Sequence, residues 1–391
     1  MPRLHRDLWV LFASMLLFAM AMSLYSVILP AHIRQLGASA VELGLLGSIA
    51  LALSTASALP GGFMADRFER RKVLLVGWAM CIPVPLVFAY ATHWTGLIPG
   101  YFLLYFSMFC NSSVQSYIAD RSTPENRSQA FTMVFATAYS LGMVFAPAIG
   151  GFMAESWGIT SVFWFSFVLY TASTAVMLMI GRSYPEAVTD RSQRFSLRIL
   201  PRSYWRYVAL FSVGFFVTHL PHSFVTPFLQ DVVGADLFLI GMLGSVTALG
   251  GVFLAPVVGK AADRFGVTRV MGIGFVGLAL CYILQVVNPV PVFLALVFFA
   301  RGGASAVQSL MSSAISGVGA ARAMGMSFAI YNLLTGLVGT VAPYTAGWLY
   351  AKNVNAPFLL TALLGTGLGV VLLLQKQPNY VPAAAEHIDG G

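Results

Sequence analysis

Apolar runs follow one another along the whole chain and leave few folds open to it. Each run is long enough for a helix to cross the roughly 30 Å hydrocarbon layer of a bilayer. Only 9% of the 391 residues are charged, against about 25% in a typical soluble domain, so most of the surface must face something other than water. The sequence predicts twelve membrane-spanning helices, at residues 8–30, 41–64, 73–92, 97–119, 129–152, 159–181, 205–229, 237–258, 270–288, 291–316, 324–350 and 355–375.

The chain repeats a loop sequence at half its length. A Gly-x-x-Ala-Asp-Arg-Phe turn that contains Asp66 and Arg67 returns 197 positions later with Asp263 and Arg264. Matches of this kind, in register over half of a membrane chain, are typical of two similar bundles in tandem. Three further pairs recur at similar offsets: Ser-Val-Gln-Ser at 113–116 with Ala-Val-Gln-Ser at 306–309, Arg127 with Arg322, and Ala-Pro at 146–147 with Ala-Pro at 342–343.

The predicted fold is an all-α membrane protein of twelve transmembrane helices in two six-helix bundles, and basic residues orient it. With the N-terminus inside the cell, the 22 Lys and Arg all fall on the cytoplasmic side except Arg34, Lys352 and Arg301. The positive-inside rule then predicts that both the N- and the C-terminus are cytoplasmic. The predicted parts are a first bundle at 1–181, a cytoplasmic linker at 182–203, a second bundle at 204–376 and a cytoplasmic tail at 377–391.

Sequence patterns for catalysis or nucleic-acid binding are absent. No nucleophile–base set, Walker loop or cluster of metal ligands is evident, and the three cysteines fall inside apolar runs, where burial is expected. The net charge of +8 follows from topology rather than from a nucleic-acid site. We therefore expect no enzyme activity, no metal and no cofactor. The expected partners are a small-molecule substrate and the lipid bilayer of the cytoplasmic (inner) cell membrane, and the chain is expected to be a monomer.

Residues 62–72 resemble the signature loop of the major facilitator superfamily, which is written G-x-x-x-D-R-x-x-R-R/K. The loop with Asp120 and Arg127 resembles the family's other cytoplasmic loop, and residues 142–151 are similar to the helix 5 pattern of its drug and proton antiporters, with Ala146 in place of a glycine. The resemblance covers all twelve predicted helices and implies a secondary transporter that works by alternating access. The residues that match are Gly62, Asp66, Arg67, Arg70, Arg71 and Lys72 in the first loop, and Gly142, Pro147, Gly150 and Gly151 in helix 5.

Both motifs suggest a role in conformational change. The carboxylate of Asp66, at the end of helix 2, would face the N-terminal end of a later helix. The dipole of that helix and nearby arginines would stabilise the carboxylate by on the order of 1 kcal/mol. Such a latch could hold the two halves closed and release them. A solvated loop that only sets topology would carry the same residues, but the repetition at Asp263 favours the latch. The small residues of helix 5 permit close helix packing, and Pro147 permits a bend.

A few polar residues fall inside the predicted spans and are candidates for substrate binding. Arg301 is the only charge well within a helix, where an isolated charge costs several kcal/mol, so we expect it to face substrate; a snorkelling arginine is the alternative. Since helices 1, 4, 7 and 10 line the central cavity in the family that the chain resembles, their polar and aromatic residues are further candidates. The predicted substrate-binding residues are Arg301, Asn111, Gln115, Gln308, Tyr25 and His222.

Proton coupling is predicted to depend on histidines. No carboxylate can be placed inside the membrane, although antiporters of this family usually have one there. His219 and His222 lie three residues apart and so share one face of helix 7. Histidine titrates near neutral pH and could carry a proton, while packed neutral histidines account for the same pattern.

Three functions follow from these features. The favoured one is efflux of amphipathic organic compounds or drugs by a secondary active transporter, with exchange for protons left open. The second is a carrier of organic anions built around Arg301. The third, a polytopic membrane enzyme or receptor, is disfavoured because the sequence shows no catalytic pattern.

Overall fold

A computed structural model describes residues 5–123, 126–184, 200–288, 290–304, 306–318 and 324–375. Every regular element in these ranges is helical. The α-helices are α1 (Arg6–Ser26), α2 (Leu29–Gln35), α3 (Ala40–Arg67), α4 (Arg70–Cys81), α5 (Val84–Tyr90), α6 (Ile98–Phe106), α7 (Asn111–Arg121), α8 (Arg127–Phe131), α9 (Tyr139–Trp157), α10 (Ile159–Met177), α11 (Arg202–His219), α12 (Val225–Phe228), α13 (Leu237–Phe265), α14 (Val267–Val287), α15 (Pro291–Ala304), α16 (Ala306–Val318), α17 (Met324–Lys352) and α18 (Ala356–Leu374).

Short 3₁₀ and π segments connect several of these helices within one membrane crossing. The 3₁₀ segments are η1 (Trp94–Leu97), η2 (Ser107–Cys110) and η5 (His222–Phe224). The π segments are η3 (Thr132–Ala138), before α9, and η6 (Leu229–Val233), after α12. Such segments inside a helix often mark functional sites.

Eleven helical spans in the described ranges are long and apolar enough to cross a membrane. Each overlaps one of the predicted apolar runs. The remaining run, 324–350, is covered by α17, a 29-residue helix with a proline, Pro343, inside it. The prediction of an all-helical, multi-pass membrane fold is confirmed.

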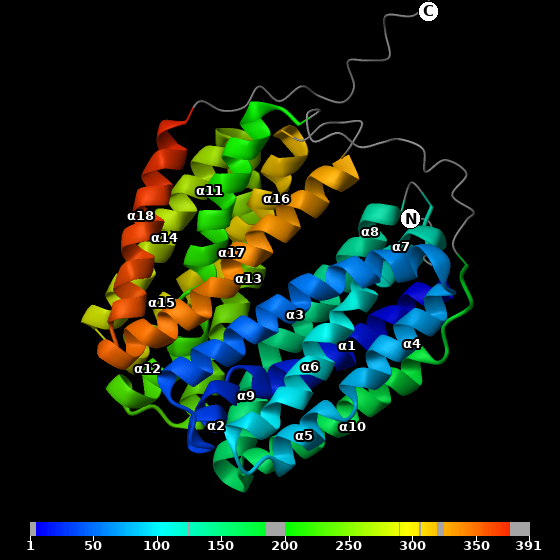
Figure 1. Ribbon diagram of the computed structural model, residues 1–391, viewed down its shortest axis with the longest axis horizontal. Helices are drawn as coiled ribbons and strands as arrows, with labels where there is room; N and C mark the ends of the chain where they lie inside the picture. Colours follow the sequence, from blue (N-terminus) through cyan, green and yellow to red (C-terminus); the bar gives the residue numbers. More distant parts are fainter. Residues whose placement is uncertain are drawn as a thin grey trace, which may run out of the picture.

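Two groups of helices make up the molecule (Figure 1). The helices α1 to α10 form one group, which we call the first half, and α11 to α18 form the second half. We call the end where α3 and α13 finish in Asp-Arg turns the motif end, and the opposite end, where α2 and η6 lie, the junction end. The two halves diverge toward the motif end in Figure 1.

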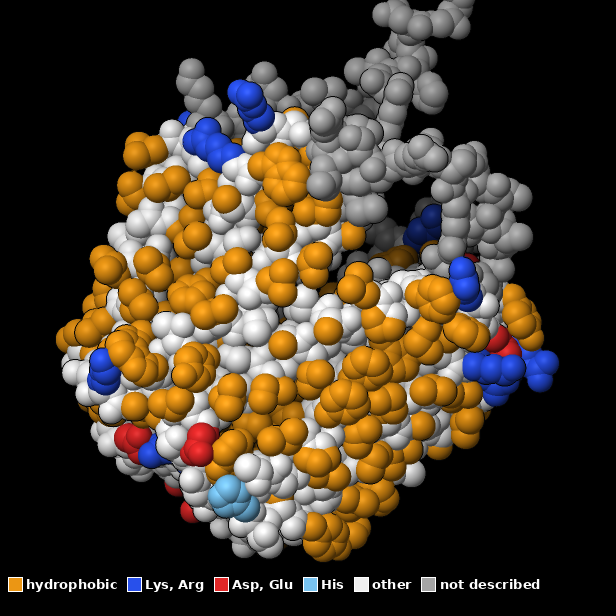
Figure 2. All heavy atoms as spheres, viewed as in Figure 1, with side chains coloured by type: hydrophobic (Ala, Val, Ile, Leu, Met, Phe, Trp, Pro, Cys, Tyr) orange, Lys and Arg blue, Asp and Glu red, His pale blue; other side chains and the backbone are white. Residues whose placement is uncertain are grey.

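The surface is that of a chain surrounded by lipid. Figure 2 shows apolar side chains spread over both halves, whereas Lys and Arg gather mainly at the motif end. Large exposed side chains include Leu59, Phe145, Phe253 and Leu363. So much exposed apolar surface is expected where the solvent is a hydrocarbon layer.

Small residues bring the helices close together. A methyl group added at Gly150 of α9 would overlap the carbonyl oxygen of Leu24 in α1, within the first half. One added at Gly151 would overlap the carbonyl oxygen of Leu237 in α13, in the second half. The predicted small residues of α9 therefore permit two close contacts: Gly150 packs against α1, and the adjacent Gly151 packs against α13. Gly142 also packs on α1, against Ala19.

Replacement of Gly150 by alanine should destabilise the protein, because its new methyl group has no room beside Leu24. Overpacking of this kind costs about 1–3 kcal/mol, so we expect the thermal unfolding midpoint of the purified protein to fall by at least about 2 °C. Gly277→Ala in α14 is the matched control, because a methyl group there meets nothing within 4 Å. Equal midpoints for the two variants would contradict the close contact.

Candidate functional site

An ion pair joins the two halves at the junction end. Arg34 in α2 donates from Nη1 to both carboxylate oxygens of Asp231 in η6, at 2.8 and 2.9 Å. The hydroxyl of Tyr350 in α17 donates to Asp231 Oδ2 at 2.8 Å. About a third of each charged side chain is exposed, 34% for Arg34 and 31% for Asp231. Since a partly solvated ion pair is worth little, this contact can form and break readily.

Two serines join the halves deeper inside the molecule. Ser245 Oγ in α13 accepts a hydrogen bond from the backbone N–H of Ala148 in α9, at 3.0 Å. Ser48 Oγ in α3 accepts one from the backbone N–H of Tyr344 in α17, at 3.1 Å. Each N–H follows a proline inside a helix, where the ring disturbs the regular hydrogen bonds. In both cases, a serine of the opposite half supplies the acceptor.

Glycines place the backbones of these helix pairs in contact. A methyl group at Gly44 of α3 would overlap the carbonyl oxygen of Pro343 in α17, and one at Gly241 of α13 would overlap that of Pro147 in α9. Both contacts, together with the serines, belong to a Gly-x-Leu-Gly-Ser sequence that occurs at 44–48 and again at 241–245. We call these two segments, with the prolines they face, the paired clasp. The paired clasp was not among the predicted features, although four of the five residues are identical in the two copies.

Further hydrogen bonds between the halves lie near the clasp. The backbone N–H of Leu237 donates to Glu155 Oε2 at 3.1 Å, and Thr226 Oγ1 donates to the carbonyl oxygen of Val27 at 2.7 Å. These five contacts between the halves, the Arg34–Asp231 ion pair and four hydrogen bonds, all lie toward the junction end. The molecule is therefore joined at one end, and the halves diverge at the other.

Candidate substrate-binding residues of α7 and α16 share exposed faces. Asn111 and Gln115 are both exposed on one side of α7, whereas Val114 and Tyr117 on its other side are buried. Asn111 Nδ2 is 3.6 Å from the sulfur of Met108. In the second half, exposed Gln308 of α16 donates from Nε2 to Thr218 Oγ1 of α11 at 3.3 Å, which links two of the predicted cavity helices.

Arg301 contacts uncharged groups of α14 and α15. Its Nη1 donates to Gln285 Oε1 at 3.3 Å. The guanidinium carbon lies 3.9 Å from the ring centroid of Phe298 and 5.6 Å from that of Tyr282. Cation–π contacts of this kind are favourable when desolvated. Gln285 is fully buried, and its Nε2 has no hydrogen-bond partner among the described residues.

The two candidate histidines lie on either side of a break in the helix. His219 ends α11, stacks on Phe215 at a centroid distance of 4.1 Å, and its Nδ1 lies 2.9 Å from the Phe215 carbonyl oxygen. That nitrogen must be the protonated one, because a carbonyl can only accept. His222 begins η5, is exposed, and is close enough to Arg301 to experience its charge.

Tyr25 lies in the core of the first half. Its side chain is 1% exposed and its ring contacts Phe88 and Phe163. Its hydroxyl is 3.1 Å from that of Tyr170 in α10. In this conformation, Tyr25 offers no surface to a ligand.

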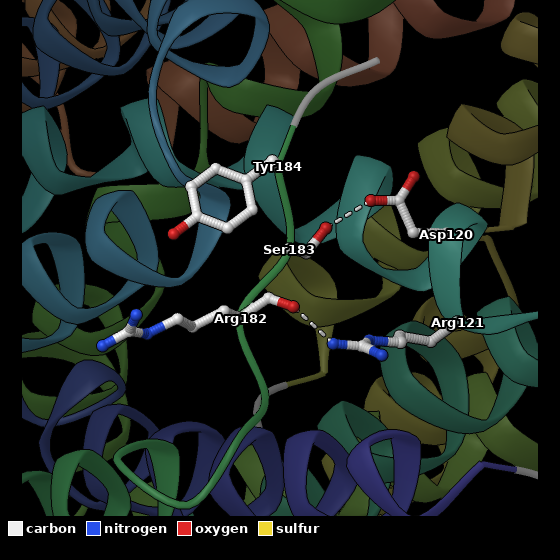
Figure 3. A pocket seen from close by; sticks show the side chains of 5 residues that line it. All are labelled: Asp120, Arg121, Arg182, Ser183 and Tyr184. Carbon is white, nitrogen blue, oxygen red and sulfur yellow. Dashed lines mark hydrogen bonds between the residues drawn. The ribbon is translucent and has the colours of Figure 1, made fainter.

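At the motif end, charged residues tie together the helix ends of the first half. Arg70 pairs with Asp120, and Ser183 donates to the same carboxylate. Arg121 Nη2 donates to the Arg182 carbonyl oxygen at 2.6 Å (Figure 3). A cavity of about 280 Å³ opens here. It is lined by Asp120, Arg121, Arg182, Ser183 and Tyr184.

Asp7, which the sequence analysis did not single out, anchors the start of α1 at this end. It accepts a hydrogen bond from the Tyr117 hydroxyl at 2.8 Å and lies 3.2 Å from Arg121 Nε. The sequence signal for Asp7 was a single acidic residue directly before the first apolar run, in a chain start that otherwise carries basic residues. Arg71 makes a similar link, from its Nη2 to the Leu178 carbonyl oxygen at 2.6 Å.

The remaining residues of the Asp-Arg turns make local contacts. The side chain of Asp66 lies outside the described part of the structure. Arg67 lies over the ring of Phe63 at 4.4 Å, and Lys72 lies 3.3 Å from Glu69. In the second half, Asp263 and Arg264 are exposed. Arg127 of the first half is exposed as well. A methyl group built on Gly62 would meet no atom within 4 Å.

Known proteins resemble this chain along nearly its whole length. A sequence profile of the Major Facilitator Superfamily matches residues 11–239 and 207–387. "Multidrug resistance protein 2" of Bacillus subtilis (strain 168) is 23% identical, over 96% of this chain and 96% of that protein. "Quinolone resistance protein NorA" of Staphylococcus aureus (strain MSSA476) is 22% identical, over 96% of this chain and 97% of that protein.

A solved structure shares the fold. The peptide transporter POT in complex with sulfate superposes with a TM-score of 0.78 at 16% sequence identity, and the match covers 94% of each chain. A likeness at this identity concerns the arrangement of helices alone. Because the family profile covers most of the sequence, this chain belongs to the Major Facilitator Superfamily.

Proposed function

We propose that the protein is a secondary active transporter that exports amphipathic organic compounds or drugs by alternating access. The single observation that carries the proposal is the asymmetry of the contacts between the halves. Two halves related by a sequence repeat are joined by hydrogen bonds at the junction end and diverge at the motif end. Alternating access needs two such halves around a site between them. The names of the two bacterial relatives, which concern drug resistance, support efflux.

The orientation follows from charge. Twelve spans with cytoplasmic termini in the inner membrane place the basic motif end in the cytoplasm, with a linker at 182–203 between bundles at 1–181 and 204–376 and a tail at 377–391. The conformation described here is then open toward the cytoplasm and closed outside, ready to take up a compound from the cell. A monomer is sufficient, since both halves lie in one chain.

Opposite ends of the molecule have complementary roles in this proposal. The paired clasp and the Arg34–Asp231 ion pair hold the outer end closed. The turn with Asp66 acts in the other state, where it holds the cytoplasmic end closed. Each contact then stabilises one state only, which is the condition for shifting a conformational equilibrium.

The substrate site lies between the halves and near the midplane. Asn111 and Gln115 from α7 and Gln308 from α16 present exposed polar groups toward it, and Arg301 and His222 lie close by. Tyr25 enters the site only if the first half rearranges. Protons are the proposed coupling ion, carried by His219 or His222 across the break between α11 and η5.

Transport by the purified protein tests the main proposal. In proteoliposomes with a pH gradient, a fluorescent amphipathic dye should move faster than in protein-free vesicles.

Asp66→Asn should slow this movement by roughly tenfold while leaving expression and folding intact, because the carboxylate acts on the balance of states. Asp263→Asn should have a weaker effect, since its turn carries Val267 and Thr268 where the first turn has basic residues. Wild-type rates equal to those of empty vesicles would refute transport, and an unchanged Asp66→Asn rate would refute the latch.

The histidines can be tested through the pH profile of transport. A double change of His219 and His222 to Gln should flatten any dependence of the transport rate on pH, because glutamine cannot bind and release a proton. His93→Gln is the control, because His93 is an exposed histidine at the junction end. A profile that survives the double change would show that protons take another route.

The outer ion pair can be tested by charge exchange. Arg34→Asp should open the outer end, because two carboxylates would then face each other, and the double variant Arg34→Asp with Asp231→Arg should close it again. The readout is labelling of a cysteine at Ser223 by a membrane-impermeant maleimide, after replacement of the three buried native cysteines. Lys352→Asp reverses a charge that lies over Trp348 and should leave labelling low. Failure of the double variant to restore protection would remove the ion pair from the gate.

A further inference from the structure

The middle of the molecule carries a positive charge that no described carboxylate neutralises. Arg301 is the eleventh residue of the 25-residue span Pro291–Ile315. Acidic side chains in the described part of the chain lie within about one helical turn of a helix end. They are Asp7, Glu42, Glu69, Asp120, Glu155, Asp231, Asp236 and Asp263.

The contacts of Arg301 leave its charge in place. Gln285 and the rings of Phe298 and Tyr282 are all neutral. They orient the guanidinium and replace part of its hydration, but they do not cancel the charge. An arginine deep in a membrane protein usually faces a partner, a wet cavity or a substrate.

A second, independent observation concerns the side chain of Gln285. Its carbonyl oxygen accepts from Arg301, so its amide nitrogen points elsewhere, is buried, and has no partner among the described residues. A buried donor without an acceptor is costly. Turning the amide over would place its NH₂ group against the guanidinium, which is worse. The amide nitrogen of Gln285 is therefore a buried donor without an acceptor among the described residues, beside a guanidinium whose charge no described carboxylate neutralises.

The pair lies close to the path proposed for the substrate. Arg301 is partly exposed, although Gln285 is not. His222 is exposed at the start of η5, in the same half as Arg301. Its neighbour Ser223 lies against Gly47 of the first half, at the contact between the halves. A compound held between the halves is thus within electrostatic reach of the guanidinium.

We propose that this transporter selects its substrates by charge: it accepts neutral and anionic amphiphiles, which bind beside the guanidinium of Arg301, and it disfavours lipophilic cations. The inference rests on the proposed transport function and names the substrate class of that site. Since opposite charges attract and like charges repel over several ångströms in a medium of low dielectric constant, the preference should be at least about tenfold.

Two ions of the same shape test the charge preference directly. Tetraphenylborate and tetraphenylphosphonium have similar size and hydrophobicity and carry opposite charges. Binding of each to the purified protein in detergent is measured from quenching of tryptophan fluorescence. Wild type should bind the borate at least about tenfold more tightly than the phosphonium. A preference for the phosphonium, equal binding of the two, or no binding of either would overturn the proposal.

Variants assign the preference to the pair. Arg301→Gln should bring the ratio of the two affinities close to one, and Arg301→Lys should retain most of it. Gln285→Glu keeps the size of the side chain and neutralises Arg301 from within, so it should also abolish the ratio. Arg206→Gln removes an exposed positive charge near the start of α11 and should leave the ratio unchanged.

These outcomes are separate from those of the transport assay. An unchanged ratio in both Arg301→Gln and Gln285→Glu would show that the preference arises elsewhere, even if transport is intact. A protein that binds the borate through Arg301 but moves no compound would refute transport and leave the charge selection standing.

Discussion

A backbone N–H group inside a bilayer must find an acceptor within the protein, because no water is there to accept from it. The prolines of α9 and α17 disturb the helices around Ala148 and Tyr344, and a serine of the opposite half accepts from each N–H. At each proline, the hydrogen bonding of one half is therefore completed by a serine side chain of the other half. At the junction end, these two hydrogen bonds lie beside the glycine contacts that bring the same pairs of helices together.

The contacts that join the halves are few, directional and modest in strength. Among the described residues, four hydrogen bonds, two of them to serine, and one partly exposed ion pair add to the packing of glycine against backbone. If that end opened, water entering between the halves could form hydrogen bonds to these groups in place of the contacts they make now. A joint built from such contacts can hold one state without locking it, as the proposed alternating access requires.

Much of the fold could be predicted because apolar length and repetition are local properties of a sequence. The close packing of Gly150 followed from the same pattern. The direction of the side chains could not be predicted in this way. Because α1 is apolar on nearly all sides, its sequence did not indicate that Tyr25 faces the core. The partner of Arg301 is sixteen residues away, in another helix, and only the tertiary arrangement brings it near. The paired clasp was visible as a repeat, but serines and glycines within apolar runs resemble ordinary packing residues.

Arg34 and Asp231 occupy the same place in the two repeats, 197 residues apart, and they contact each other. Such a position lies on the pseudo-twofold axis, where a residue meets its own counterpart. Two identical copies of the first half would bring two arginines together, and two copies of the second would bring two aspartates. A symmetric dimer of either half could not close with this pairing. The opposite charges therefore make the two halves complementary, so that each half fits the other better than it would fit a second copy of itself.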